Sequence, residues 1–283
     1  MTVAIVSGKG GTGKTTVAVN LATVTEGALQ VLDCDVEAPN VRLFFGGTPM
    51  TEERITVPVP RVDAALCDGC GECSRFCAFN AIVAFETTAL VFPELCHSCG
   101  GCVKVCPKNA LSEIPRAIGA ITIQRTDRVT LIEGRLDIGV AMAPPLIHAV
   151  KARARTDLPT IVDAPPGASC SVVAALRGAD VALLVTEPTP FGLHDMRVVV
   201  DVVQTFNLPC GVVINRAGNG DERVQAFCRE QKLPILMELP DDRRIATACS
   251  RGELLLDVLP AYRSDFARVW EWVCAHETNA PGR

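Results

Sequence analysis

The stretch GKGGTGKTT, residues 8–16, decides the fold of this chain, and it matches two different nucleotide-binding motifs. From Gly8 to Gly13 it is the G-x-G-x-x-G of a dinucleotide site. From Gly8 to Thr15 it is the G-x-x-x-x-G-K-T of a nucleoside triphosphatase. Both motifs follow a strand and open a helix, and the apolar segment TVAIV at residues 2–6 provides the strand. The fold is therefore α/β with either ligand.

The acidic residues further along the chain favour the triphosphatase. The dinucleotide motif has support from Asp33, which ends the next apolar segment at about the place where a ribose-binding acid would lie. A triphosphatase needs Lys14 for the β- and γ-phosphates and the Thr15 hydroxyl for Mg²⁺. Asp163 ends the apolar segment TIVD and would hold the same ion. We therefore predict that the chain binds ATP or ADP with Mg²⁺.

Apolar segments typical of buried parallel strands alternate with helical stretches along the rest of the chain. The strand candidates are TVAIV, LQVLD, TIVDA, DVALLVT, CGVVIN and LPILMEL. The helical stretches lie near residues 14–25, 170–178, 192–205 and 221–231. This alternation predicts an α/β fold with a doubly wound, mostly parallel sheet, in which ligands bind at the carboxyl ends of the strands.

Eight of the 14 cysteines fall in two copies of one motif. CDGCGECSRFCAFNAI begins at Cys67, and CHSCGGCVKVCPKNAL begins at Cys96. Such self-similarity indicates that one small unit has been duplicated. Each copy reads C-x2-C-x2-C-x3-C, the spacing that binds [4Fe-4S] clusters in bacterial two-cluster ferredoxins. We therefore predict two [4Fe-4S] clusters.

The spacing also predicts which cysteines share a cluster. Three thiolates three residues apart wrap one cluster, and the fourth lies too far along the chain and binds the other cluster. The two predicted sets are Cys67, Cys70, Cys73 and Cys106 for the first cluster, and Cys96, Cys99, Cys102 and Cys77 for the second. Structural zinc is the alternative, but zinc sites generally use two C-x2-C pairs. The other cysteines are expected to be small apolar residues of the interior: Cys34, Cys170, Cys210, Cys228, Cys249 and Cys274.

The flanking segments predict that the cysteine-rich region is inserted into the α/β domain. TPMTEERITVPVPRVDAAL, before Cys67, is rich in proline and suits a linker or an edge strand. The run after Asn109 alternates polar and apolar residues, as strands do. We predict a P-loop domain in two parts, residues 1–59 and 116–283, with a small α+β, bacterial-ferredoxin-like domain at residues 60–115.

Composition excludes several classes of function. A net charge of −5 and an isoelectric point near 5.5 do not suggest an extended basic surface for nucleic acid, and they leave a local basic patch open. No apolar run is long enough for a membrane-spanning helix, and the beginning MTVAIVSGKGG lacks the basic region of a secretory signal. We expect a cytoplasmic protein with no nucleic-acid partner and no stable membrane insertion.

With Lys9 included, the loop KGGTGKT resembles the deviant Walker A motif of the MinD/ParA family of ATPases. Asp33-Cys34-Asp35 is similar to the switch I D-x-D of that family, and DAPPG from Asp163 is similar to switch II. VINRAG resembles the strand end that binds adenine. The resemblance covers nearly all 283 residues, and with the cysteine insert the chain is similar to MinD-superfamily ATPases that carry a two-cluster ferredoxin domain.

The phosphates would lie against backbone N–H groups at a helix N-terminus. The expected nucleotide-binding residues are Gly10, Gly11, Thr12, Gly13, Lys14, Thr15, Thr16, Asn215 and Arg216, the last two beside adenine. Asp35 would orient the attacking water, and Asp163 would hold Mg²⁺ through a water. The resemblance implies that Lys9 reaches a partner's phosphates, so hydrolysis would require a homodimer or a heterodimer with a related ATPase.

Three hypotheses combine the two predicted sites. The first is ATP-gated electron transfer, in which the nucleotide state controls delivery of electrons through the clusters to an unidentified redox partner protein. The second is an iron–sulfur assembly or carrier ATPase, although eight evenly spaced ligands would hold clusters firmly. The third is a positioning ATPase of the MinD/ParA type with a redox-sensing insert. The first is favoured because the insert closely follows the predicted switch I along the chain.

Overall fold

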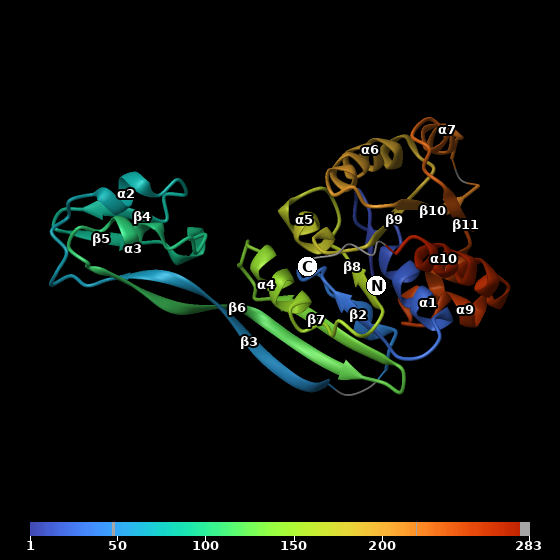
Figure 1. Cartoon of the computed structure of the whole chain (residues 1–283), viewed down its shortest axis with the longest axis horizontal. Coiled ribbons are helices and arrows are strands. Elements are labelled where there is room, and N and C mark those ends of the chain that lie inside the picture. Colours follow the sequence, from blue (N-terminus) through green and yellow to red (C-terminus); the bar gives the residue numbers. More distant parts are fainter. Residues whose placement is uncertain (47–48, 219, 278–283) are drawn as a thin grey trace. The chain divides into compact units, whose positions relative to one another are not determined.

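The computed structural model describes residues 1–46, 49–218 and 220–277, and it divides into two compact units. The larger unit comprises Met1–Glu52, Ile121–Arg135 and Ile147–Arg283, and the smaller unit comprises Glu53–Ala120 and Leu136–Leu146 (Figure 1). The smaller unit includes more of the chain than residues 60–115, which the sequence predicts to be an insert. Strands β3 and β6 each contribute residues to both units, so they carry the chain from one unit to the other.

The fold is α/β with a large, mostly parallel sheet, as predicted. Nine strands follow the order β11-β10-β9-β1-β8-β2-β7-β6-β3, and every neighbouring pair from β11 to β7 is parallel. The bounds are Thr2–Val6 (β1), Leu29–Asp33 (β2), Pro49–Val62 (β3), Leu111–Arg125 (β6), Val129–Leu136 (β7), Thr160–Asp163 (β8), Val181–Thr186 (β9), Cys210–Ala217 (β10) and Ile235–Pro240 (β11). Because the strand order reverses direction at β1, the loop after β1 lies at a topological switch point.

The helices of the larger unit fall between these strands along the chain, except for the last three, which follow the last strand, β11. Their bounds are Lys14–Val24 (α1), Pro144–Lys151 (α4, shared with the smaller unit), Cys170–Leu176 (α5), Pro190–Thr205 (α6), Arg223–Glu230 (α7), Arg243–Ser250 (α8), Leu255–Val258 (α9) and Arg263–Ala275 (α10). The amphipathic α10 contacts α1 and β11, and its Phe266, Val269 and Val273 are fully buried in the core. No helix in the described ranges combines the length and the apolar character needed to cross a bilayer.

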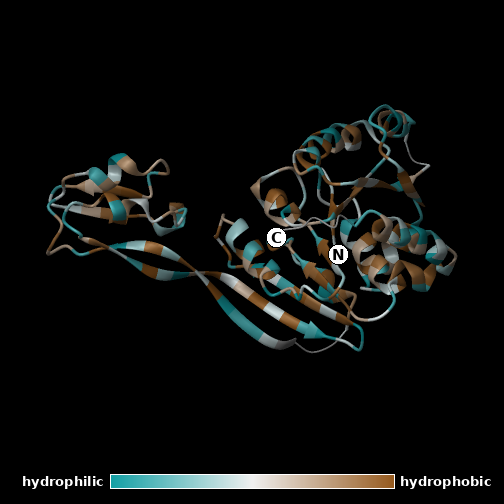
Figure 2. Cartoon of the chain, in the orientation of Figure 1, coloured by the Kyte–Doolittle hydropathy of each residue, from teal (hydrophilic) through white to brown (hydrophobic). Residues whose placement is uncertain are grey.

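The core of the larger unit forms around the central strands. Hydrophobic residues concentrate on the strands and on the helix faces that cover them (Figure 2). All of β2, β8 and β9 is buried, which is expected of parallel strands with both faces covered. Buried polar side chains interrupt this apolar interior at or just after strand carboxyl ends, among them Ser7, Asp33, Asp163, Thr186 and Glu187. Buried polar groups of this kind need partners, so they mark the place to look for a ligand.

The smaller unit repeats its backbone conformation in register with the repeat in the sequence. It contains α2 (Glu72–Phe76), α3 (Gly101–Val105) and the antiparallel hairpin of β4 (Ile82–Phe85) and β5 (Thr88–Val91). The two helices begin at equivalent positions of the two motif copies. Left-handed residues also recur at equivalent positions, with φ of 53° at Asn80 and 51° at Asn109. The duplication is therefore present in the backbone structure as well as in the sequence.

The six cysteines outside the motif do not all lie in the interior. Cys34 and Cys228 are buried, and Cys210 and Cys249 are half-buried. Cys170 and Cys274 are exposed, so the expectation of burial was wrong for these two. Cys170 is the first residue of α5 and Cys274 lies in the last turn of α10, and both face solvent.

Candidate nucleotide site and cysteine cavities

Gly13 allows the loop after β1 to turn directly into α1. Its φ of 98° is left-handed, and a Cβ at this position would lie 2.4 Å from Asn215 Nδ2. Only glycine fits such a position without strain. The unpaired N–H groups of the first turn of α1 therefore open directly onto the loop, which is the arrangement that binds phosphate.

Lys14 is buried in this loop with a neutral partner. Its side chain is 6% exposed, and Nζ donates a hydrogen bond of 2.8 Å to Ser7 Oγ. Burial lowers the pKa of Lys14, while the nearby carboxylates of Asp163 and Asp35 act in the opposite direction. An ammonium that is desolvated and has no salt bridge among the described residues gains most from an incoming anion. The arrangement suits a phosphate group.

Thr15 and Asp163 form a matched hydroxyl and carboxylate pair. Thr15 Oγ1 donates to Asp163 Oδ2 at 2.6 Å, joining the start of α1 to the end of β8. Asp163 is 1% exposed, and its Oδ1 has no hydrogen-bond partner in the described structure. Burial raises the pKa of Asp163 to about 6. A buried carboxylate with a free oxygen beside a hydroxyl fits Mg²⁺ and its bound water, because a cation offsets the desolvation of the charge.

The two aspartates of the D-x-D differ in their surroundings. Asp33 is fully buried, and its Oδ2 accepts the N–H groups of Asn40 at 2.9 Å and Val41 at 3.0 Å. Burial and the neighbouring Asp163 raise the pKa of Asp33. Asp35 is half-buried, and burial raises its pKa while the Lys14 ammonium lowers it. Asp33 thus fixes the following loop through its two backbone hydrogen bonds. Asp35 is more exposed than Asp33 and lies close enough to Lys14 for the ammonium to oppose the rise in its pKa.

Glu187 is a site residue that sequence reasoning missed. It follows β9, its side chain is 6% exposed, and its Oε2 lies 2.7 Å from Lys9 Nζ. Its other oxygen lies 2.7 Å from Arg216 Nη1. The available signal was its position, since Glu187 directly follows a buried strand, much as Asp163 ends one. In the described structure Lys9 is therefore held by its own chain.

Asn215 connects β10 to the phosphate-binding loop. Its Nδ2 donates to the Thr12 carbonyl oxygen at 2.7 Å. Through these contacts the structure brings together the predicted residues Lys9, Thr12, Gly13, Lys14, Thr15, Asp35, Asp163, Asn215 and Arg216. They lie at or next to the carboxyl ends of four strands, β1, β2, β8 and β10, and Glu187 adds the end of a fifth strand, β9. A role for Asn215 and Arg216 beside adenine stays a prediction.

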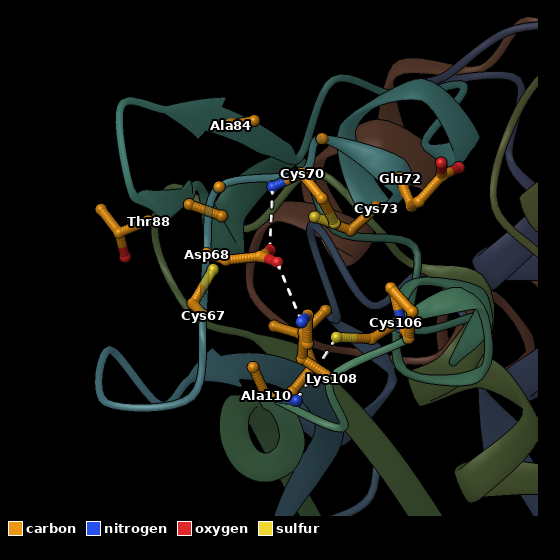
Figure 3. Close-up of a pocket in the computed structure, with 15 residues that line it drawn as sticks. Cys67, Asp68, Cys70, Glu72, Cys73, Ala84, Thr88, Cys106, Lys108 and Ala110 are labelled. Carbon is orange, nitrogen blue, oxygen red and sulfur yellow. Dashed lines mark hydrogen bonds and ion pairs between the residues drawn. The ribbon is translucent and has the colours of Figure 1, made fainter.

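The first predicted cysteine set lines one cavity of the smaller unit. Figure 3 shows Cys67, Cys70, Cys73 and Cys106 around it, with Asp68 and Lys108 beside them. The Cys106 sulfur accepts the Ala110 N–H at 3.3 Å. Burial raises the pKa of the Cys73 thiol, so the neutral thiol is favoured there unless a bound metal stabilises the thiolate.

The second predicted set lines a second cavity. Cys77, Cys96, Cys99 and Cys102 surround it, together with Phe79 and His97. The Cys77 sulfur accepts the Ala81 N–H at 3.3 Å, which is the equivalent of the Ala110 bond in the first cavity. Within residues 1–46, 49–218 and 220–277, no group of three or more His, Cys, Asp or Glu side chains is placed to hold a single metal ion.

Comparison with known sequences identifies a family. The model of the "CobQ/CobB/MinD/ParA nucleotide binding domain" matches residues 3–256. An uncharacterized protein of Methanocaldococcus jannaschii is 30% identical over 261 residues, covering 90% of this chain and 91% of its own length. A second uncharacterized protein of that organism is 33% identical over 225 residues, covering 77% and 79%.

Comparison with solved structures shows the same fold. The cell division ATPase MinD of Pyrococcus furiosus has a TM-score of 0.61 and 21% identity, covering 97% of this chain and 98% of that one. The septum site-determining protein MinD of Pyrococcus horikoshii, complexed with Mg-ADP, has a TM-score of 0.59 and 22% identity, covering 99% and 100%. At these identities the likeness concerns the fold alone.

Proposed function

The chain belongs to the CobQ/CobB/MinD/ParA nucleotide-binding family, and on that premise we propose that it is a Mg²⁺-dependent ATPase that gates electron transfer through two [4Fe-4S] clusters. The clusters would lie in a ferredoxin-like domain within residues 60–115. The observation that carries the proposal is that each predicted cysteine set lines one cavity, with the fourth cysteine of each copy in the other copy's cavity.

The nucleotide site supports the ATPase half of the proposal. When bound, Mg²⁺ neutralises charge that develops on the β- and γ-phosphates. Thr15 and Asp163 would hold that ion, and the free Asp163 Oδ1 is the atom available to its bound water. Lys14 binds phosphate oxygens with its desolvated ammonium, and Asp35 orients the attacking water with its freer carboxylate.

The cysteine cavities support clusters rather than zinc. A zinc ion needs four ligands within about 2.3 Å of one point. The described residues contain no such convergent group, and each cysteine set instead surrounds a cavity. Backbone N–H groups donate to the sulfurs of Cys77, Cys96 and Cys106, at 3.3, 3.4 and 3.3 Å. Hydrogen bonds of this kind stabilise cluster thiolates and tune their potentials.

The connectivity of the chain supports coupling between the two functions. The Asp33 carboxylate anchors Asn40 and Val41, in the loop that would respond to the nucleotide. The next strand along the chain is β3, which continues into the smaller unit. A change in this loop would therefore act on the segment that leads to the clusters. A second copy or a related ATPase would complete the site, with Lys9 reaching its phosphates.

The experiment is anaerobic purification with iron counting, followed by electron paramagnetic resonance with and without Mg-ATP. We expect about eight irons per chain and reduction of an added acceptor that changes on adding Mg-ATP. Equal acceptor reduction together with nucleotide-independent cluster potentials would contradict gating. Transfer of iron and sulfide to an apo-protein that continues in the presence of a chelator would favour a cluster carrier instead.

A further inference from the structure

The two cysteine cavities are lined by different pairs of side chains at equivalent positions of the two motif copies. In the first cavity, Lys108 Nζ lies 3.3 Å from Asp68 Oδ2. When the two motif copies are aligned, Asp68 corresponds to His97 and Phe79 corresponds to Lys108. In the second cavity these counterparts stack, with ring centroids 3.6 Å apart and planes inclined by 10°. An exposed ion pair thus borders one cavity, and an aromatic stack borders the other.

The glycine turns of the two motif copies lie next to side chains of opposite charge. Gly71 and Gly100 are equivalent residues, with left-handed φ of 80° and 69°. Arg75 Nη1 lies 3.1 Å from the point where a Cβ on Gly71 would be. Glu113 Oε1 lies 3.2 Å from the same point on Gly100, and the residue equivalent to Glu113 in the first cavity is Ala84. The same backbone turn therefore meets a guanidinium in one cavity and a carboxylate in the other.

The acids around the two cavities also differ in pairing. At the first cavity Asp68 pairs with Lys108, and Glu72 pairs with Arg75 at 2.6 Å. At the second cavity Glu113 has no salt bridge to any described residue. The apolar side chains of Phe76, Phe79, Pro58 and Pro60 make up much of the remaining wall.

Reduction of a cluster adds one negative charge to it. A nearby carboxylate and an apolar wall both oppose that added charge, whereas a nearby guanidinium or ammonium favours it. At the first cavity each acid is paired with a base, so these charges largely cancel. At the second cavity the Glu113 carboxylate, which has no salt bridge among the described residues, and the apolar wall both oppose the added charge, and these two differences act in the same direction. They favour an electron in the first cavity over an electron in the second.

We propose that the duplicated site is electrically asymmetric, so that the cluster in the first cavity has the higher reduction potential and accepts the first electron. Glu113 is the positioning residue that lowers the potential of the second cluster. The inference rests on the proposed presence of two clusters. With dithionite as the one-electron reductant, one electron fills the first cluster, and a second electron enters the other cluster only at lower potential.

The test is a potentiometric titration of the full, cluster-loaded chain, followed by electron paramagnetic resonance of the reduced clusters. We expect two separate one-electron steps. Glu113→Gln should raise the lower potential and leave the higher one in place, and Ala84→Glu should lower the higher one. Asp127→Asn is the matched control, because it removes one charge at an exposed position that lines neither cavity. It should shift neither step.

Single-cluster variants assign the steps. Cys99→Ser should keep the higher-potential step, and Cys70→Ser should keep the lower one. The inference is overturned if the two steps coincide, if the assignment is reversed, or if Glu113→Gln moves neither potential. If Glu113→Gln loses iron, Ala84→Glu and the two cysteine variants decide the question. A native chain without iron would overturn the proposed function itself, whereas iron with equal potentials would overturn only this asymmetry.

Discussion

At the scale of single residues, the buried carboxylate of Glu187 pairs with both Lys9 and Arg216, so it would compete with a partner's phosphates for the Lys9 ammonium. Glu187→Gln removes that charge while keeping the shape of the side chain. ATP-dependent dimerisation should then need severalfold less ATP, since forming the dimer no longer breaks the Lys9 ion pair. Analytical ultracentrifugation across an ATP series measures this. The exposed Glu26→Gln is the matched control, and an unchanged midpoint in Glu187→Gln would argue against a restraining role.

Lys14 is expected to be needed for ATP hydrolysis but not for cluster binding. It lies in the larger unit, where its ammonium contacts Ser7. Lys14→Ala should lower the rate of ATP hydrolysis by about a thousandfold or more, because the charge on the phosphates loses its neutralising partner. Iron content should stay near about eight per chain. Phosphate release and iron assays on one preparation check both, and loss of iron would mean that the nucleotide site supports the whole fold.

At the scale of elements, the junction between β1 and α1 depends on Gly13. Gly13→Ala would combine a left-handed backbone cost of about 1–2 kcal/mol with a clash against Asn215. Gly27→Ala is the matched control, because φ at Gly27 is 73° and a Cβ there would meet nothing within 4 Å. Urea unfolding should show a larger loss for Gly13→Ala, accompanied by loss of nucleotide binding. Equal losses in both variants would exclude the clash.

The sequence predicted the central elements because both of their faces are buried. Apolar runs at β1, β2, β8, β9 and β10 leave a strong signal, and the edge strand β11 was predicted from its apolar run although it is only partly buried. Because of Pro58 and Pro60, the sequence did not decide whether residues 48–66 form a linker or an edge strand. The structure has the edge strand β3 there, and an edge strand can contain prolines. The short helices α8 and α9 were not predicted, because such helices depend on tertiary packing more than on pattern.

The sequence predicted those site residues that a local motif identifies. It did not predict contacts between residues that are far apart along the chain. Lys14, Thr15 and Asp163 follow from motif spacing and from an acid at a strand end. The contact between Lys9 and Glu187 joins segments far apart in sequence, so no local pattern contains it. The opposite charges at Gly71 and Gly100 likewise require the fold, since Glu113 lies on β6, beyond the end of the motif whose turn it faces.

At the scale of the whole molecule, the two units differ greatly in the size of their cores. The core of the larger unit gathers residues from most of its strands and helices. Among the described residues of the smaller unit, the buried cluster around the cysteine cavities consists of Cys73, Ile82, Ala89, Cys102 and Leu111. Two of these five are predicted cluster ligands. So small a core rarely stabilises a domain alone, and bound metal commonly supplies the remainder.

Removal of iron should therefore unfold the smaller unit and spare the larger one. We expect hydrogen exchange within residues 63–110 to accelerate by at least about a hundredfold, because the stabilisation from metal binding is lost there. Exchange in β1, β8 and β9 should stay slow, and ATP affinity should change by less than about twofold. The matched control is chelator-treated protein reloaded with iron and sulfide, which should recover slow exchange. Protection that survives in iron-free protein would show that the small core folds alone, and a loss of ATP affinity would show that the two units do not fold independently.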